Sequence, residues 1–366
     1  MRRLLALIIL ILLLSCTRAE DVTPAVSYSP SSTHGSWVAG DMHTHSVHSD
    51  GFGTIFENFA AANQAGMDFV VITDHNNSRG WEDAQIAGSQ HDIIPIRGNE
   101  YTRSLTHALF INADSERDYS DLPPVQATCA FRVDSNNQGL VYVAHPFVFG
   151  EDSWLMADAW GADIDGIEVW NGWYSANHIS QVSARQRWDE LNNEGRRLFG
   201  IATTDSHSAN TVGAVFTTIY VEQISAEGII EAMRLGRMYG SNGPVIDFRA
   251  GASMMGDVFD VPQEGQTVTV NLSGEYVEEF EQVLLIKNGI AIDTRAISAT
   301  SFDYSVDVFV LPGDLLRMEA FGIEQGVRTH TYDGREAASL VSAPFAFSNP
   351  IFFESDVDEG ENELSR

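Results

Sequence analysis

Continuous apolar runs recur along the first two thirds of the chain, and they constrain its fold more than any other feature. Such runs are typical of strands covered on both faces, as in parallel sheets. They lie at residues 68–72, 92–96, 140–144, 166–170, 198–202 and 212–221. Helical patterns separate them: a capping box from Thr54 to Glu57 starts a helix that Gly66 ends, and further helices are expected at 175–194 and 225–235. Alternating strands and helices predict an α/β barrel or a doubly wound sheet.

The pattern changes after Gly243-Pro244, where helices are no longer expected. Asn288-Gly289, flanked by apolar residues, indicates a tight β-hairpin. Short strands are predicted at 268–272, 283–287, 290–293, 302–309 and 316–321. We therefore expect the barrel at 36–247 and a small all-β, sandwich-like domain at 248–353.

The first residues indicate a targeting segment. Arg2 and Arg3 precede an apolar run from Leu4 to Leu14, which is too short to span a bilayer. The run ends at Cys16 in a sequence that resembles a bacterial lipobox, with a plain secretory peptide as the alternative. We expect a lipoprotein signal peptide at 1–15, lipidation of Cys16 and a flexible tether at 16–35. The protein would then be exported and lipid-anchored to the cell envelope, at the outer membrane or periplasm of a bacterium.

The chain is strongly acidic, with 51 Asp and Glu residues against 21 Lys and Arg residues and a formal net charge of −30. A surface of this charge repels nucleic acid and anionic membranes. We expect no nucleic-acid partner, and membrane contact only through the lipid anchor. The acidic residues at 354–366 predict a disordered tail.

Histidines and carboxylates follow the apolar runs at corresponding points. His43 and His45 share one face of an extended segment, and so do Asp205 and His207, because the side chains of residues i and i+2 point the same way. Parallel barrel strands deliver their carboxyl ends to one rim, which brings such residues together. Imidazole and carboxylate groups are ligands for first-row divalent metals. The candidate ligands are His43, His45, Asp50, His75, Glu100, His107, His145, Asp205 and His207.

The residues in this pattern resemble those of a known family. The segments are Asp41-Met-His-Thr-His45, Ser49-Asp50-Gly51, Thr73-Asp-His75, Glu100, Ala144-His-Pro146 and Asp205-Ser-His207. In order and spacing, from about residue 40 to 245, the chain resembles the PHP (polymerase and histidinol phosphatase) family. Gly98-Asn-Glu-Tyr-Thr102 with His107 is similar to its carbaryl-hydrolase-like branch. The resemblance implies a distorted (β/α)7 TIM-like barrel and a metal-dependent hydrolase.

The resemblance also implies a cluster of two or three divalent ions, with Zn, Mn or Fe as candidates. The first would be held by His43, His45, Glu100 and Asp205, and the second by Glu100, His107 and His145. The third would be held by Asp50, His75 and His207. His48 is an alternative to Asp50, because both can face the same site.

Such a cluster would activate a metal-bound hydroxide for attack on a phosphoester. Carbamate, ester or amide hydrolysis on the same metal site is the alternative, and a non-catalytic, surface-binding lipoprotein is a second one. Arg79 and Arg103 lie near the expected rim, where a guanidinium can clamp a phosphate. Asp74 is expected to steady a ligand imidazole, and Glu168 to be a rim contact or part of a buried pair.

Overall fold

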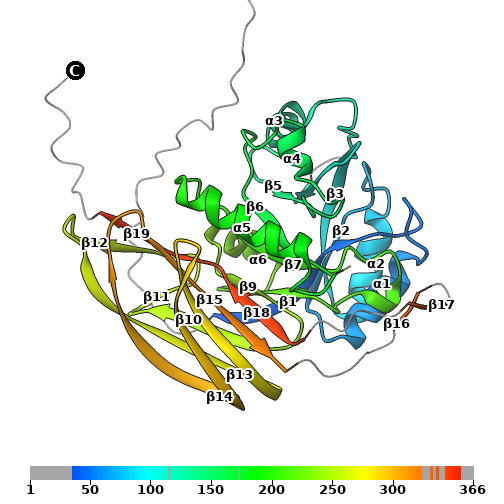
Figure 1. Cartoon of the computed structure of the whole chain (residues 1–366). Coiled ribbons are helices and arrows are strands. Elements are labelled where there is room, and N and C mark those ends of the chain that lie inside the picture. The colour runs from blue at the N-terminus through cyan, green and yellow to red at the C-terminus, as the bar shows by residue number, and fades with distance from the viewer. Residues whose placement is uncertain are drawn as a thin grey trace, which may run out of the picture. The chain divides into compact units, whose positions relative to one another are not determined.

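The computed structural model describes residues 35–113, 116–172, 174–323, 330–332, 335–337 and 343–355, all in one compact unit (Figure 1). The expected signal peptide, Cys16 and almost all of the expected tether lie outside the described residues, as does the expected tail beyond Ser355. Within the part of the chain that is described, no helix is long and apolar enough to cross a bilayer.

Seven strands form the barrel, and five of them coincide with apolar runs of the sequence. They are β1 (Ser36–Thr44), β2 (Phe69–Ile72), β3 (Ile94–Arg103), β4 (Thr106–Ile111), β5 (Leu140–Val143), β6 (Gly166–Asn171) and β7 (Phe199–Thr203). Each strand pairs with the next in chain order, and β4 is antiparallel to both β3 and β5. The segment after β7 closes the barrel on β1, where the backbone N–H of His45 donates to the Ser206 carbonyl at 2.7 Å.

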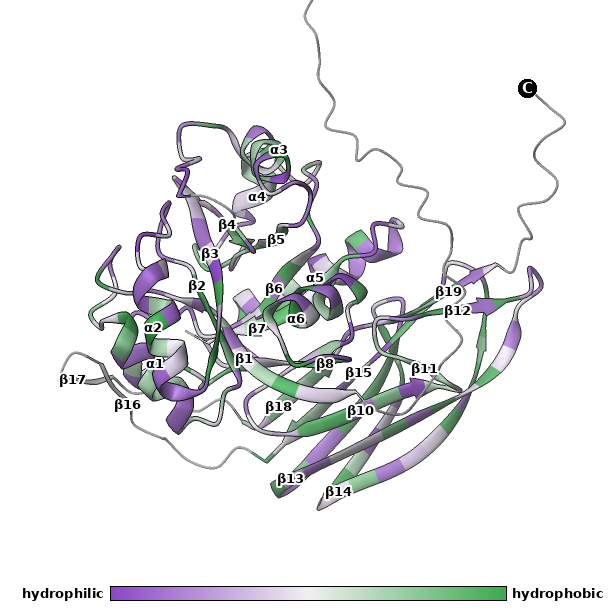
Figure 2. Ribbon diagram, turned by 180° about the vertical axis from the view of Figure 1, so that it is seen from behind, coloured by the Kyte–Doolittle hydropathy of each residue, from purple (hydrophilic) through white to green (hydrophobic). Residues whose placement is uncertain are grey.

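Helices lie on the outside of these strands (Figure 2), and apolar residues such as Phe59 and Met233 are buried. They are α1 (Ile55–Gln64), α2 (Trp81–His91), α3 (Pro124–Asp134), α4 (Ser153–Met156), α5 (Ile179–Asn193) and α6 (Ala226–Leu235). The capping box of α1 is formed, with Thr54 accepting from the Glu57 backbone and the Glu57 side chain accepting in return. Gly236 ends α6 with a φ of 67°, a left-handed conformation that favours glycine.

Two strands extend the sheet beyond the barrel, after the short 3₁₀ turn η1 (Ala209–Thr211). β8 (Phe216–Val221) pairs antiparallel with β1, and β9 (Met238–Ser241) pairs with β8. The run at 212–221 is therefore not an eighth parallel strand, because it returns along β1 in the opposite direction.

The C-terminal region is rich in β-strands, as expected. It comprises β10 (Val245–Ala250), β11 (Ser253–Met254), β12 (Val258–Val261), β13 (Gln266–Lys287), β14 (Ile290–Val310), β15 (Leu315–Gly322), β16 (His330–Tyr332), β17 (Arg335–Ala337), β18 (Phe345–Ser348) and β19 (Ile351–Ser355). Asn288 and Gly289 form the turn of the long β13–β14 hairpin. β10 pairs with the first half of β13 and β15 with the second half, all within one continuous sheet, and the buried side chains of these strands share one apolar core.

The barrel and the β-rich region are joined by strand pairing and by buried hydrogen bonds. β18 pairs with β9, which makes the sheet continuous between the two regions. Asn349, after β18, exchanges hydrogen bonds with the backbone of Gly200 in β7 at 2.7 and 2.9 Å. The fold class predicted from the sequence, an α/β barrel followed by an all-β region, is confirmed. The expected boundary at residue 247 falls inside β10 and stays a prediction.

Candidate metal centre

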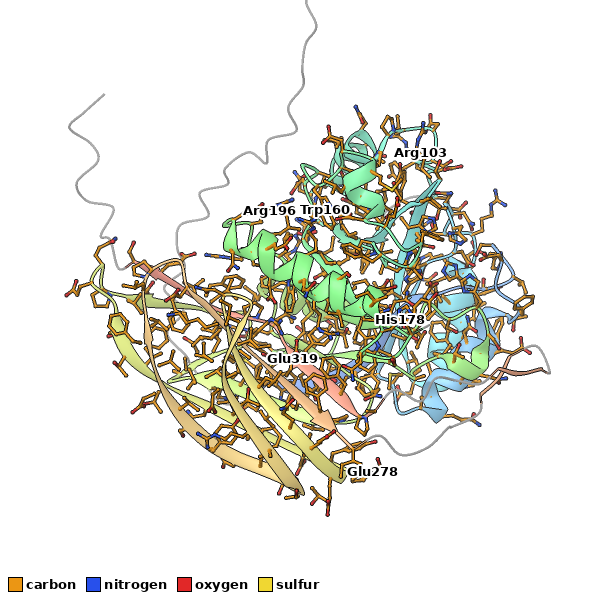
Figure 3. All side chains as sticks on the ribbon, in the orientation of Figure 1. Arg103, Trp160, His178, Arg196, Glu278 and Glu319 are labelled. Atoms are coloured by element: carbon orange, nitrogen blue, oxygen red, sulfur yellow. The ribbon has the colours of Figure 1, made fainter. Side chains whose placement is uncertain are left out.

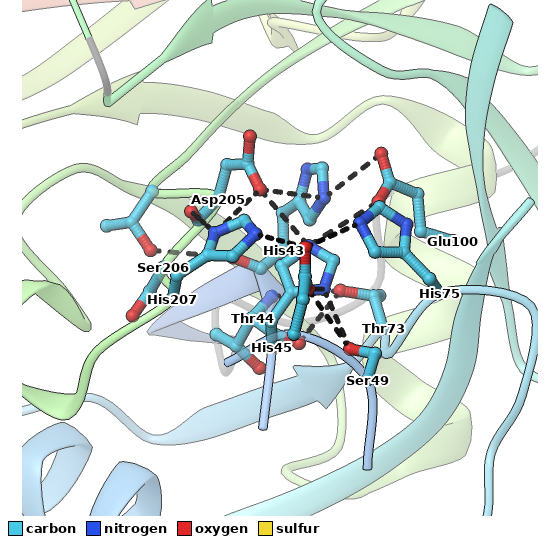
Figure 4. Close-up of polar contacts among 12 residues, drawn as sticks. His43, Thr44, His45, Ser49, Thr73, His75, Glu100, Asp205, Ser206 and His207 are labelled. Atoms are coloured by element: carbon cyan, nitrogen blue, oxygen red, sulfur yellow. Dashed lines mark hydrogen bonds and ion pairs between the residues drawn. The ribbon is translucent and has the colours of Figure 1, made fainter. Parts of the chain in front are cut away.

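The candidate ligands meet at one end of the barrel, where the strands β1, β2, β3, β5 and β7 finish (Figure 4). His43 lies in β1 and His45 directly after it, while His75, His145 and Asp205 each follow a strand end. A bridge between His75 and Glu100 continues the parallel pairing of β2 and β3 to this rim. Strand order therefore brings together residues that are up to 164 positions apart, from His43 to His207.

Glu100 occupies the centre of the cluster and is fully buried. Its carboxylate oxygens lie near the ring nitrogens of His43 (3.4 Å), His45 (3.4 Å), His75 (2.8 Å), His107 (3.0 Å) and His145 (3.1 Å). His107 reaches this point because β4 turns back on β3, which sets His107 opposite Thr102. A carboxylate surrounded by imidazoles has the geometry of a ligand that bridges two cations.

Asp205 forms a second meeting point. Its Oδ1 lies 3.3 Å from Nε2 of His43 and 3.1 Å from Nε2 of His45, and its Oδ2 lies 3.7 Å from Nε2 of His145. Asp205 and His145 both have positive φ angles, of 52° and 26°. Such angles are uncommon for residues other than glycine and concentrate at functional sites.

Asp50 joins the outer side of the cluster. Its carboxylate oxygens lie 3.6 Å from Nδ1 of His45, 3.4 Å from Nε2 of His75 and 3.3 Å from Nε2 of His207. His48, the sequence alternative, instead approaches Asp83 of α2 at 3.8 Å. Of the two candidates in this loop, the structure brings Asp50 to the other ligands and turns His48 away from them.

The electrostatics of the centre favour positive charge. Burial opposes ionisation of Glu100, but His43, His107 and His145 hold the pKa of its carboxyl well below the ordinary value. Burial likewise opposes protonation of His145, yet Glu100 and Asp205 raise the pKa of this imidazole to about 9. Carboxylates that stabilise a proton on an imidazole also stabilise a divalent cation in its place.

Several buried ligand atoms lack hydrogen-bond partners, and they test whether metal ions fit. Nε2 of His43, Nε2 of His45 and Oε2 of Glu100 are buried without a partner in hydrogen-bond geometry. Nε2 of His45 lies 3.4 Å from Oε2 of Glu100, and Nε2 of His43 lies 3.4 Å from Oε1 of the same carboxylate. Buried polar atoms of this kind are costly unless something binds them. In three groups that consist of candidate ligands alone, the ligand atoms lie within 4.8 Å of one another. The groups are His45, Asp50, His75 and His207; His43, His45 and Asp205; and His75, Glu100 and His107. The donor set therefore fits several divalent ions.

The remaining predicted site residues lie outside this set of contacts. Asp74 accepts from the backbone and hydroxyl of Ser46 at 2.8 and 2.7 Å and from Ser49 at 2.7 Å, so it orders the loop after His45. Arg103, at the end of β3 (Figure 3), donates to the Ser120 carbonyl at 2.8 Å. Arg79 is exposed in the loop that follows His75.

Two buried carboxylates behind the ligands were not assigned as site residues from the sequence. Glu168 lies 2.9 Å from Nδ1 of His43, and burial, which would raise its pKa, is outweighed by His43, which lowers it. Asp41 accepts from the backbone of Thr204 and Gly213, both at 3.1 Å, and ties the segment after β7 to β1. Both signals were present in the sequence: a charge inside the apolar run of β6, and a carboxylate two residues before His43.

The fold and the cluster together define an α/β barrel with buried histidine, aspartate and glutamate side chains at the rim of its strands, in groups that suit divalent metal ions. Residues 41–144 match the family model for the PHP domain. This segment runs from within β1 to just after β5 and contains six of the nine candidate ligands, from His43 to His107, with His145 directly after it. No curated protein matches the chain.

The solved structures that are similar to the chain include the following three. One is a two-domain protein of Bacteroides vulgatus containing a predicted PHP-like metal-dependent phosphoesterase, with 16% identity, 79% of this chain and 91% of that chain covered, and a TM-score of 0.48. A metal-dependent phosphoesterase candidate of Bifidobacterium adolescentis has 18% identity, with 46% and 87% covered and a TM-score of 0.35. An amidohydrolase of Chromobacterium violaceum with bound sulfate has 15% identity, with 46% and 87% covered and a TM-score of 0.35.

Proposed function

We propose that the protein is a metal-dependent hydrolase that cleaves phosphoesters with two or three divalent metal ions. The observation that carries the proposal is the position of Glu100, whose two oxygens face five imidazoles at 2.8 to 3.4 Å in a fully buried setting. The match of residues 41–144 to the PHP domain supports the same reading. Zn, Mn and Fe all suit this mixed set of imidazoles and carboxylates.

Different groups of candidate ligands would hold the separate metal ions. Glu100, His107 and His145 would hold one ion and Asp205, His43 and His45 another, with Asp50, His75 and His207 at an outer position. Bound divalent ions act as Lewis acids and lower the pKa of water to about 7. Arg79 is the exposed cation nearest in sequence to the outer ligands and would contact a phosphate, whereas the guanidinium of Arg103 is already engaged by Ser120.

A carbamate, ester or amide substrate is the second candidate, and one observation favours it. Phe149 is half exposed, and its ring centroid lies 5.8 Å from that of His107 and 6.1 Å from that of His145. An apolar ring next to the ligands suits an uncharged organic group better than a phosphate dianion.

The experiment is a substrate panel with protein loaded with Zn²⁺ or Mn²⁺ and checked by elemental analysis. The panel comprises p-nitrophenyl phosphate, bis-p-nitrophenyl phosphate and 1-naphthyl methylcarbamate. Turnover of a phosphoester supports the first candidate, and turnover of the carbamate alone supports the second. Bound metal without any turnover would contradict both and favour a binding function.

Export and lipidation at Cys16 form a separate part of the proposal, supported by the sequence from Arg2 to Cys16. The full chain expressed in a Gram-negative host should label with a fatty-acid probe and fractionate with membranes. Cys16→Ser should release it to the soluble fraction. Soluble wild-type protein without label would overturn the anchor and leave the hydrolase proposal untouched.

A further inference from the structure

Glu168 connects three candidate ligands that come from three different strands. It lies in β6 and is fully buried. Its Oε1 accepts from Nδ1 of His43 at 2.9 Å and from the Thr203 hydroxyl. Its Oε2 accepts from the backbone N–H of His145 at 2.7 Å and from Nδ2 of Asn171 at 3.1 Å. The same nitrogen of Asn171 donates to Oδ2 of Asp205 at 3.2 Å, which extends the connection to a third ligand.

Four donors already surround this carboxylate, and they occupy the lone pairs that a metal ion would need. Glu168 together with His43 and His145 has the spacing of a ligand group. The hydrogen bonds instead indicate that it acts on the metal centre through its neighbours.

We propose that Glu168 is the positioning residue of the metal centre, fixing the tautomer of His43 and the backbone of His145 so that both rings present a lone pair to the metal ions. This inference rests on the proposed function. Because Oε1 of Glu168 accepts a hydrogen bond from Nδ1 of His43, a neutral His43 carries its proton on Nδ1. The lone pair of Nε2 is then free to bind a metal ion. The hydrogen bond to the His145 backbone holds that residue at its positive φ of 26°.

Replacement by glutamine keeps the shape of the side chain but supplies one acceptor and one donor. The backbone N–H of His145 and the amide of Asn171 can only donate toward it, so the glutamine oxygen must face them. The glutamine NH₂ group then faces His43, whose Nδ1 becomes the acceptor and whose Nε2 takes the proton. A protonated Nε2 cannot bind a metal ion.

The test compares Glu168→Gln with Asp165→Asn in the full chain. Asp165 is a largely buried carboxylate just before β6 that accepts from Arg132 at 2.6 Å and from the backbone of Val141 at 2.7 Å. It serves as a control for the structural cost of removing a charge near this strand. Zn²⁺ affinity is measured by competition with a chromophoric chelator. The His43 tautomer is measured by ¹⁵N NMR of labelled, metal-free protein at alkaline pH, because the carboxylates around this ring favour its doubly protonated form at neutral pH.

Glu168→Gln should bind Zn²⁺ about 10- to 100-fold more weakly than wild type, with the His43 proton moved to Nε2. Asp165→Asn should lower stability without either change. Wild-type affinity and an unchanged tautomer in Glu168→Gln would overturn the inference alone, and so would an equal loss in both variants. Failure of the wild type to bind Zn²⁺ would overturn the proposed function as well.

Discussion

Arg317 of β15 and Asp189 of α5 form a two-pronged ion pair between the β-rich region and the barrel. Nε lies 2.8 Å from Oδ1 and Nη2 lies 2.6 Å from Oδ2, with Arg317 only 3% exposed. Nη1 of the same guanidinium donates to Glu319 at 2.6 Å, and the guanidinium carbon lies 5.1 Å from the ring centroid of Trp188. Glu319, which lies on β15 together with Arg317, is labelled in Figure 3. One cation therefore compensates two buried carboxylates.

Arg317→Ala should destabilise the protein strongly, because it leaves Asp189 and Glu319 buried without their main partner. Breaking a buried pair in this way costs about 3–5 kcal/mol. Urea unfolding followed by circular dichroism measures the change. Arg295→Ala is the control, since Arg295 pairs with Asp293 at 3.0 Å on the surface of the hairpin and such pairs contribute about 0–1 kcal/mol. Equal effects of the two substitutions would contradict this view of the interface.

The buried ion pairs of Glu319 lead us to expect a loss of stability in acid. Burial would raise the pKa of Glu319, but Arg317 and Arg185 lower it below its ordinary value of 4.5. The unfolded chain therefore binds a proton at this site more readily than the folded protein. Its contribution to stability is complete above about pH 4.5 and is lost as the pH falls through the lower folded pKa.

Wild type and Glu319→Gln should accordingly differ most in free energy of unfolding near neutral pH, and this difference should shrink below about pH 4.5. Urea unfolding across this range measures it. A difference that stays constant, or grows with acidity, would show that the carboxylate of Glu319 is not stabilised by its arginines.

Asp50→Asn should lower the number of metal ions bound per chain, because Asp50 supplies the carboxylate beside His75 and His207 at 3.4 and 3.3 Å. The outer position should empty first, since Asp50 has a side chain that is 55% exposed while Glu100 is fully buried. His48→Gln is the matched change in the same loop and should retain the wild-type metal content. Elemental analysis after equilibrium dialysis decides, and metal loss in His48→Gln with retention in Asp50→Asn would reverse the assignment.

The sequence predicted the barrel because its strands are continuous apolar runs, and it predicted the cluster because parallel strands share a rim. It did not predict β4, which was not among the expected strands, and an apolar run would carry no information about the antiparallel direction of this strand. The sequence also could not predict the hydrogen-bond partners of the buried acidic residues. Asp74 and Glu168 are both buried acids near strand ends, and only the folded geometry shows that Asp74 contacts serines while Glu168 contacts His43.

Aromatic residues next to the ligands allow a last prediction about substrate binding. Phe149 is 49% exposed and edge-on to His107, and Phe52 is 62% exposed with its backbone N–H bonded to the carbonyl of His207 at 2.8 Å. An aryl group bound near the metal ions would cover part of the Phe149 ring. Aromatic contacts of this kind contribute about 0.5–1.5 kcal/mol, which corresponds to a roughly 2- to 10-fold change in affinity.

Phe149→Ala should therefore weaken inhibition by phenylphosphonate about 2- to 10-fold and leave inhibition by methylphosphonate unchanged. The inhibition constants are measured with metal-loaded protein and whichever substrate of the panel it turns over. Phe309→Ala provides the control, because Phe309 is similarly exposed at 54% but lies on β14 in the C-terminal region. An equal loss for both inhibitors would mean that Phe149 supports the ligands His107 and His145 rather than the organic group of a substrate.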